Sequence, residues 1–265
     1  MKTLMNCILA CLIILIPALT YASNREIIKP LITELANVPK TVLLVGNSLM
    51  YYNNGVGSYV HKISREMGIP ISFTMVAISG SGLDWHLVKS YLRPNGLRLY
   101  STTGDKRNKL VFHEYPEGRI FDAVILQDNS QGPIHSELSK LFIKYAEIHC
   151  KDIREAGAEP LIMMTWAYAG KPEMTEKLAN ATIAAANENR AMVAPVGLAF
   201  ANALKGKPDL KLIVDDKRHP TPAGTYLEAC VIFSTLTKKS AEGARCTGIG
   251  EAKITRQTAK KKKKI

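Results

Sequence analysis

The sequence has few of the residues, and none of the short motifs, that build metal or nucleotide sites. Cysteine accounts for only five of the 265 residues, and no pair of cysteines has the spacing of a zinc site. Neither a Walker phosphate loop nor the glycine pattern of dinucleotide-binding domains occurs. Five of the six histidines also lack the spacing of metal ligands, and these are His61, His86, His113, His135 and His149. We therefore expect a protein that uses no metal ion and no other cofactor.

An apolar stretch long enough to span a membrane is missing as well. The longest uninterrupted run, Cys7–Ile16, is well short of the roughly 20 residues that a transmembrane helix needs. Lys2 precedes this run, and Pro17 and the small residues Thr20 and Ala22 follow it, which is the pattern of a cleavable signal peptide. We predict a signal peptide over residues 1–22 and a secreted or periplasmic protein, with an uncleaved membrane anchor as the alternative.

The charge of the chain is concentrated at its end. The formal net charge is +12, and the last fifteen residues contribute +6 of it. We predict that residues 251–265, which include the run Lys260–Lys264, form a basic, disordered tail that makes weak electrostatic contacts with an anionic cell envelope. Interleaved aromatic residues and nucleic-acid-binding motifs do not accompany this charge, so we expect no specific nucleic-acid partner.

Loss of the signal peptide leaves three cysteines, which are Cys150, Cys230 and Cys246. An odd number leaves at least one thiol unpaired even in an oxidising compartment. Cys230 and Cys246 have positions that allow a disulfide across the end of the last predicted helix. The alternative is that all three are small buried apolar residues.

Short apolar runs alternate with amphipathic stretches through residues 23–250, which we take as one domain. We expect strands at Thr41–Val45, Ile71–Ala77, Phe121–Leu126, Pro160–Thr165 and Met192–Val196. We expect helices at Arg25–Ala36, Val56–Met67, Ser136–Ala156, Glu173–Asn189 and Thr221–Thr237. Regular alternation of this kind predicts an α/β fold, a three-layer α/β/α sandwich around a five-stranded parallel sheet.

Glycines and small polar residues follow the first three predicted strands. Ser48 lies in a Gly-Asn-Ser turn after the first strand, Gly80 and Gly82 follow the second, and Asn129 follows the third. Ligands of open parallel sheets bind beyond the carboxyl ends of the strands. These positions therefore predict a site that contains Ser48.

A base for this serine is present near the end of the domain. His219 precedes Pro220 in a short loop, and Thr221 has the chemistry of a helix N-cap. Asp216 lies three residues upstream, a spacing that suits a carboxylate bonded to one ring nitrogen, which leaves the other nitrogen to take the Ser48 proton. Asp215 is the adjacent alternative to Asp216. The oxyanion of a tetrahedral intermediate would be bound by the N–H groups of Ser48 and Gly80 and the side-chain amide of Asn129.

In these residues the sequence resembles the SGNH hydrolases, also called GDSL-type esterases and lipases. The four blocks of that family are matched in order by "VGNSL" with Ser48, "ISGSGL" with Gly80, "ILQDNS" with Asn129, and "DDKRHP" with Asp216 and His219. The resemblance covers positions 41 to about 236. It implies the flavodoxin-like version of the sandwich and a Ser-His-Asp hydrolase with a covalent acyl-enzyme.

Two blocks depart from the pattern of the family. Asn47 stands where the family usually has aspartate, and Gln127, Asp128 and Ser130 surround Asn129 where Gly-x-Asn-Asp is usual. The assignment of Asn129 to the asparagine of the third block is therefore an inference. In the second block Gly82 competes with Gly80, which is favoured because it follows the strand more closely.

These observations predict a serine esterase acting on an acylated small molecule or carbohydrate, for example by removing O-acetyl groups. A basic, aromatic-containing insertion, Arg93 to Arg119, is expected to contribute to specificity at the same edge of the sheet. The alternative is a catalytically silent protein of the same fold that binds glycan or envelope.

Overall fold

The computed structural model describes residues 26–102, 109–113 and 120–244. The predicted signal peptide, the predicted tail, Cys246 and part of the insertion lie outside these residues. Within them, no helix has the length and apolar character needed to cross a membrane.

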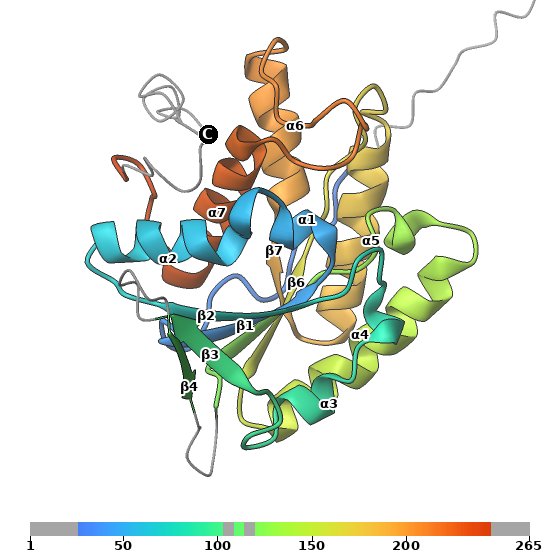
Figure 1. The fold of residues 1–265 in the computed structure, drawn as a ribbon. Coiled ribbons are helices and arrows are strands. Elements are labelled where there is room, and N and C mark those ends of the chain that lie inside the picture. Colours follow the sequence, from blue (N-terminus) through green and yellow to red (C-terminus); the bar gives the residue numbers. More distant parts are fainter. Residues whose placement is uncertain (1–25, 103–108, 114–119, 245–265) are drawn as a thin grey trace, which may run out of the picture.

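A five-stranded parallel sheet forms the centre of the molecule (Figure 1). Its strands are β1 (Thr41–Gly46), β2 (Ser72–Ala77), β5 (Ala123–Leu126), β6 (Glu159–Met163) and β7 (Met192–Ala194). They lie in the order β2-β1-β5-β6-β7, and the register pairs Val45 of β1 with Val76 of β2 and with Leu126 of β5. The chain order reverses at β1, so the crevice of this fold lies at the carboxyl ends of β1 and β5.

Helices cover both faces of the sheet and create two cores. The helices are α1 (Ser48–Tyr51), α2 (Val56–Glu66), α3 (Val88–Tyr91), α4 (Leu138–Glu155), α5 (Met174–Glu188), α6 (Val196–Gly206) and α7 (Pro222–Thr237). Side chains alternate along each strand, so Val42 and Leu44 of β1 pack with α2, α6 and α7, and Leu43 and Val45 pack with α3, α4 and α5. The predicted three-layer sandwich is confirmed, with all five expected strands in place.

The expected helix at Arg25–Ala36 is wrong. Its described part, from residue 26, is an irregular strap in which Ile28 and Leu31 are exposed. Pro30 interrupts the helical pattern and supplies no backbone N–H. Amide side chains of α5 bind the backbone instead, because Asn180 accepts from the N–H of Ile28 at 2.8 Å and Asn187 accepts from that of Leu31 at 2.8 Å.

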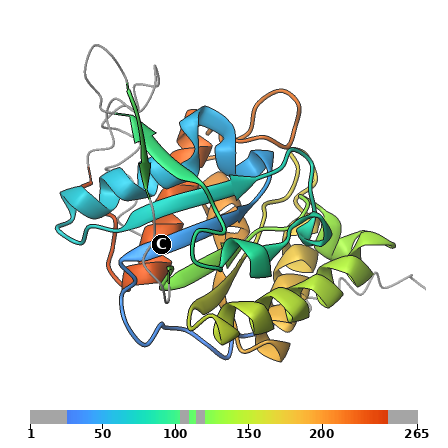
Figure 2. The same ribbon diagram turned by 60° about the horizontal axis from the view of Figure 1, so that its bottom comes forward.

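Several elements were not expected from the sequence, among them α6 and a hairpin. The helix α6 follows β7 directly, where we expected the last strand to continue to Val196. The insertion contains an antiparallel hairpin of β3 (Leu99–Thr102) and β4 (Leu110–His113), which belongs to a sheet of its own. Figure 2 shows this hairpin at the margin of the molecule on the side of β2.

Candidate active site

Ser48, His219 and Asp216 form one hydrogen-bonded chain. The hydroxyl of Ser48 is 2.8 Å from Nε2 of His219. On the other side of the ring, Nδ1 of His219 is bonded to a carboxylate oxygen of Asp216. Because a carboxylate only accepts, Nδ1 carries the ring proton and Nε2 is left to accept the hydrogen of Ser48. The structure thus brings Ser48 next to His219 and Asp216, which follow it in the sequence by more than 160 positions.

The end of β1 presents Ser48 through a cap made by Asn47. The side-chain oxygen of Asn47 accepts from the N–H of Leu49 at 3.1 Å, which begins α1 at Ser48. Its side-chain nitrogen donates to the carbonyls of Ser81 at 2.8 Å and Asp128 at 3.2 Å. A carboxylate could not donate to these two carbonyls, so the amide at this position ties the loops after β2 and β5 to the nucleophile turn.

A narrow loop before α7 holds His219. Its two sides are bonded to each other, since the N–H of Val214 donates to the carbonyl of His219 at 2.9 Å. The indole N–H of Trp166 donates to the carbonyl of Arg218 at 2.8 Å and fixes the loop from the side of β6. Thr221 caps α7, as predicted, by accepting from the N–H of Gly224. The imidazole is therefore placed by backbone contacts on both sides.

The hydrogen bonds of Asp216 favour its ionised form. One of its oxygens accepts the N–H groups of Arg218 and His219, both at 2.9 Å, and the other binds the imidazole. The slight burial of Asp216 acts to raise its pKa. The hydrogen bonds act in the opposite direction and together have the larger effect, so the pKa is lowered to about 2. The neighbouring Asp215 is exposed and is not bonded to the ring.

Gly80 and Asn129 line the same pocket as Ser48, whereas Gly82 does not. Gly80 has a φ of +74°, a left-handed conformation that glycine adopts without strain, and its side-chain position is open. A Cβ on Gly82 would lie 2.7 Å and 2.9 Å from the carboxylates of Asp84 and Asp128, so Gly82 allows close packing behind the loop. The amide nitrogen of Asn129 donates to the carbonyl of Gly80 at 3.2 Å, and this bond joins two of the three candidate oxyanion donors.

The pocket around Ser48 is small and partly polar, with a volume of about 170 Å³. Its lining also includes residues that were not predicted as site residues from the sequence, and these are Leu49, Tyr51, Tyr52, Ser79, Ser130 and Arg218. The ring of Tyr52 is stacked on His219. The position of Tyr52, four residues after the nucleophile on the same short turn, was the only signal that could have indicated it.

Several residues near the sequence blocks lie outside this pocket. His86 is buried and its Nε2 is 3.0 Å from the hydroxyl of Ser81. Trp166 is a core residue stacked on Phe200, with ring centroids 4.4 Å apart. No described residue of the insertion lines the pocket. The exposed Tyr100 and Phe112 of the hairpin therefore do not support the expected contact with substrate.

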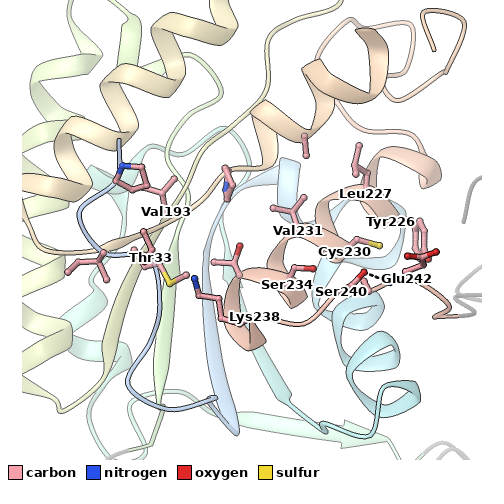
Figure 3. Close-up of a pocket in the computed structure, with 17 residues that line it drawn as sticks. Thr33, Val193, Tyr226, Leu227, Cys230, Val231, Ser234, Lys238, Ser240 and Glu242 are labelled. Carbon is pink, nitrogen blue, oxygen red and sulfur yellow. Dashed lines mark hydrogen bonds between the residues drawn. The ribbon is translucent and has the colours of Figure 1, made fainter. Parts of the chain in front are cut away.

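A second, more apolar cavity of about 420 Å³ lies between α7 and the strap (Figure 3). Thr33, Val193 and Cys230 are among its lining residues, and it shares none with the pocket of Ser48. We locate the candidate active site in the smaller pocket because the Ser48 hydroxyl and the His219 ring line it.

In the described ranges, no group of three or more histidine, cysteine or acidic side chains is placed to hold a metal ion.

The described cysteines are buried. Cys150 is a residue of α4 that is buried in the core, and burial raises the pKa of its thiol to about 12. Cys230 lies in the opposite core, on α7. The disulfide between Cys230 and Cys246 stays a prediction because Cys246 is not described.

Solved structures with the same fold include hydrolases and esterases. A candidate SGNH hydrolase from Slackia heliotrinireducens is 22% identical, with 74% of this chain and 98% of that protein covered and a TM-score of 0.54. A DUF4886 family protein from Bacteroides uniformis is 20% identical, with 83% and 91% covered and a TM-score of 0.54. A catalytic mutant of an acetylxylan esterase from Geobacillus stearothermophilus is 12% identical, with 74% and 94% covered and a TM-score of 0.51. No protein-family model and no curated protein sequence matches the chain. The chain has the fold of the SGNH hydrolases.

Proposed function

We propose that this protein is a serine esterase that hydrolyses short acyl esters, such as the O-acetyl groups of carbohydrates, through an acyl-enzyme on Ser48. The observation that carries the proposal is the bonded chain from Ser48 through His219 to Asp216. An isolated serine hydroxyl is a poor nucleophile, and this arrangement supplies the base and the group that orients it.

In the proposed mechanism, Oγ of Ser48 attacks the ester carbonyl carbon while Nε2 of His219 takes the hydroxyl proton. Asp216 balances the charge of the imidazolium. The N–H groups of Ser48 and Gly80 and the amide of Asn129 bind the oxyanion. The imidazolium then donates its proton to the leaving alcohol, and water, activated by the same imidazole, releases the acid and restores Ser48.

The size of the pocket supports a short acyl group. Its volume of about 170 Å³ is below the roughly 300 Å³ at which pockets for larger ligands begin. An acetylxylan esterase is among the proteins with the same fold, which favours an acetylated carbohydrate as the first substrate to test.

We also propose that the mature protein acts outside the cytoplasm. The signal-peptide pattern of residues 1–22 supports export, and the lysine-rich end supports weak attraction to anionic envelope polymers. N-terminal sequencing of the protein expressed with its own leader tests the export, since we expect the mature chain to begin at Ser23.

Labelling by a fluorophosphonate probe, together with turnover of nitrophenyl acetate and acetylated xylo-oligosaccharides, tests the enzymatic function. We expect the wild type to be labelled and active and Ser48→Ala to be folded, unlabelled and inactive. Ser58→Ala is a matched control, because Ser58 is an exposed serine of α2 whose hydroxyl donates to the carbonyl of Asn54. An unlabelled, inactive wild type would favour the catalytically silent binding protein, and undiminished turnover by Ser48→Ala would refute the nucleophile.

A further inference from the structure

We propose that Asp128 and His149 are positioning residues that hold the peptide groups of Leu83 from both sides and thereby fix the oxyanion-binding loop that carries Gly80. This inference rests on the proposed function, because it assigns a catalytic consequence to the contact. Neither residue touches the pocket of Ser48. Their effect on the reaction would therefore be indirect, through the loop after β2.

The contacts with Leu83 are short and buried. The N–H of Leu83 donates to a carboxylate oxygen of Asp128 at 2.8 Å. The carbonyl of Leu83 is 2.9 Å from Nε2 of His149, a residue of α4. Because a carbonyl only accepts, Nε2 must carry the hydrogen. The backbone on both sides of Leu83 is thus bound by two side chains from different elements.

The same two side chains are connected to Gly80 and Asn129, which are two of the three candidate oxyanion donors. Gly80 lies three residues before Leu83 on the held loop, and Asn129 directly follows Asp128. A Cβ on Gly132 would lie only 2.0 Å from the second carboxylate oxygen of Asp128, so this carboxylate is packed tightly against the loop after β5 as well. The hydrogen bond from Asn129 to the Gly80 carbonyl then closes the connection between the loops.

The histidines near Leu83 are in surroundings that favour their uncharged form. Burial lowers the pKa of His149 and of His86, the histidine bonded to Ser81 in the same loop. Burial raises the pKa of Asp128 to about 6, with a smaller contribution in the same direction from the charge of Asp84. The charge of Asp152, also on α4, acts in the opposite direction to burial, because it raises the pKa of His149. We call the two side chains that bind Leu83, those of Asp128 and His149, the Leu83 clamp. At pH 8 the clamp consists of an ionised Asp128 and an uncharged His149.

The test measures hydrogen exchange in residues 80–87 and steady-state kinetics at pH 8 for His149→Phe, which removes the donor and keeps a ring. We expect faster exchange in this loop, a fall in kcat of roughly tenfold or more, and a KM within about twofold of the wild type, because oxyanion donors act on the transition state. In His149→Gln the side chain retains an N–H donor, so most of the activity and protection should return.

The matched control is His61→Phe. His61 also binds a backbone carbonyl through a ring nitrogen, that of Ile71 at 2.8 Å, but on α2 and away from the loop. We expect the control to leave kcat and the exchange of residues 80–87 unchanged. Should His149→Phe not fold, Asp128→Asn provides the same two measurements, with a several-fold fall in kcat expected because a neutral amide accepts a weaker hydrogen bond.

Unchanged exchange in residues 80–87 of a folded His149→Phe would overturn the clamp. Faster exchange with unchanged kcat would overturn its catalytic role, as would equal losses of kcat in His149→Phe and His61→Phe. An inactive wild type would instead refute the proposed function, and the exchange measurement would still decide whether His149 holds the loop.

Discussion

The imidazole of His219 lies flat against the phenol ring of Tyr52, with ring centroids 4.1 Å apart and ring planes inclined by 6°. Tyr52 follows the nucleophile turn directly, and both rings line the pocket of Ser48. An aromatic face attracts a cation, so this stack would stabilise the imidazolium of the proposed mechanism, in which His219 takes the serine proton. It also restricts rotation of the ring away from Ser48.

Replacing Tyr52 should accordingly weaken catalysis without removing it. A cation over an aromatic face at a partly exposed site contributes about 0.5–1 kcal/mol, which corresponds to a fall in kcat of roughly two- to fivefold for Tyr52→Leu. Tyr52→Phe keeps the ring and should retain nearly the wild-type kcat. Steady-state turnover of nitrophenyl acetate measures both variants, and equal losses in the two would assign the effect to the hydroxyl of Tyr52 instead.

Asn129→Ala should lower kcat by roughly 10²–10³ with little change in KM, if its amide binds the oxyanion. The reason is that the amide would meet a charge present only in the transition state. Asn189→Ala serves as a control, because Asn189 donates its amide to the carbonyl of Ala185 at the end of α5, far from the pocket. A raised KM with unchanged kcat would show that Asn129 binds the substrate in its ground state.

Asp216→Asn should reduce kcat far more than Asp215→Asn. Only Asp216 accepts the Nδ1–H of His219, and an amide there can present its own N–H and favour the wrong tautomer of the ring. We expect a loss of several hundredfold or more for Asp216→Asn and less than about threefold for Asp215→Asn. Kinetics at a fixed pH above 7 make this comparison, and the opposite ranking would move the orienting role to Asp215.

The sequence alone was sufficient to predict the five strands and to place Ser48, Asp216 and His219 in a turn and a loop, because these features depend on local patterns. The β-branched run before Gly46 predicts a buried strand, and His219 before a proline and an N-cap predicts a histidine held at a helix start. The rule that ligands bind beyond the carboxyl ends of parallel strands then predicts that Ser48 and Asn129 lie at the same edge of the sheet.

The features that the sequence did not predict depend on contacts between distant segments. The strap at Ile28 looks helical by periodicity, but its backbone is bound by amide side chains of α5 some 150 residues away. The clamp on Leu83 joins residues from the loops after β2 and β5 and from α4. The stack of Tyr52 on His219 joins positions 167 apart. No local pattern carries this information, because each contact exists only after the sheet has formed.

A carboxyl group with no use in the proposed mechanism is buried on α7, and this makes stability depend on pH. Glu228 is 0% exposed, and neither of its side-chain oxygens has a hydrogen-bond partner within the described part of the chain. Burial raises the pKa of Glu228 well above its ordinary value of 4.5, so the folded protein favours the protonated form. The unfolded chain ionises this group near its ordinary pKa.

The sign of the effect follows from this difference. The stability that the raised pKa contributes is complete below pH 4.5 and is lost as the pH rises from there toward the folded-state pKa, at about 1.4 kcal/mol per pH unit. Glu228→Gln removes the titration, so its melting temperature relative to the wild type should increase steadily from pH 5 upward. Glu147→Gln, at an exposed position of α4, should keep a constant difference over the same range. Melting curves of the three proteins at pH 5 to 8 test the prediction, and a wild type that runs parallel to Glu228→Gln throughout would mean that the carboxyl is ionised in the folded state.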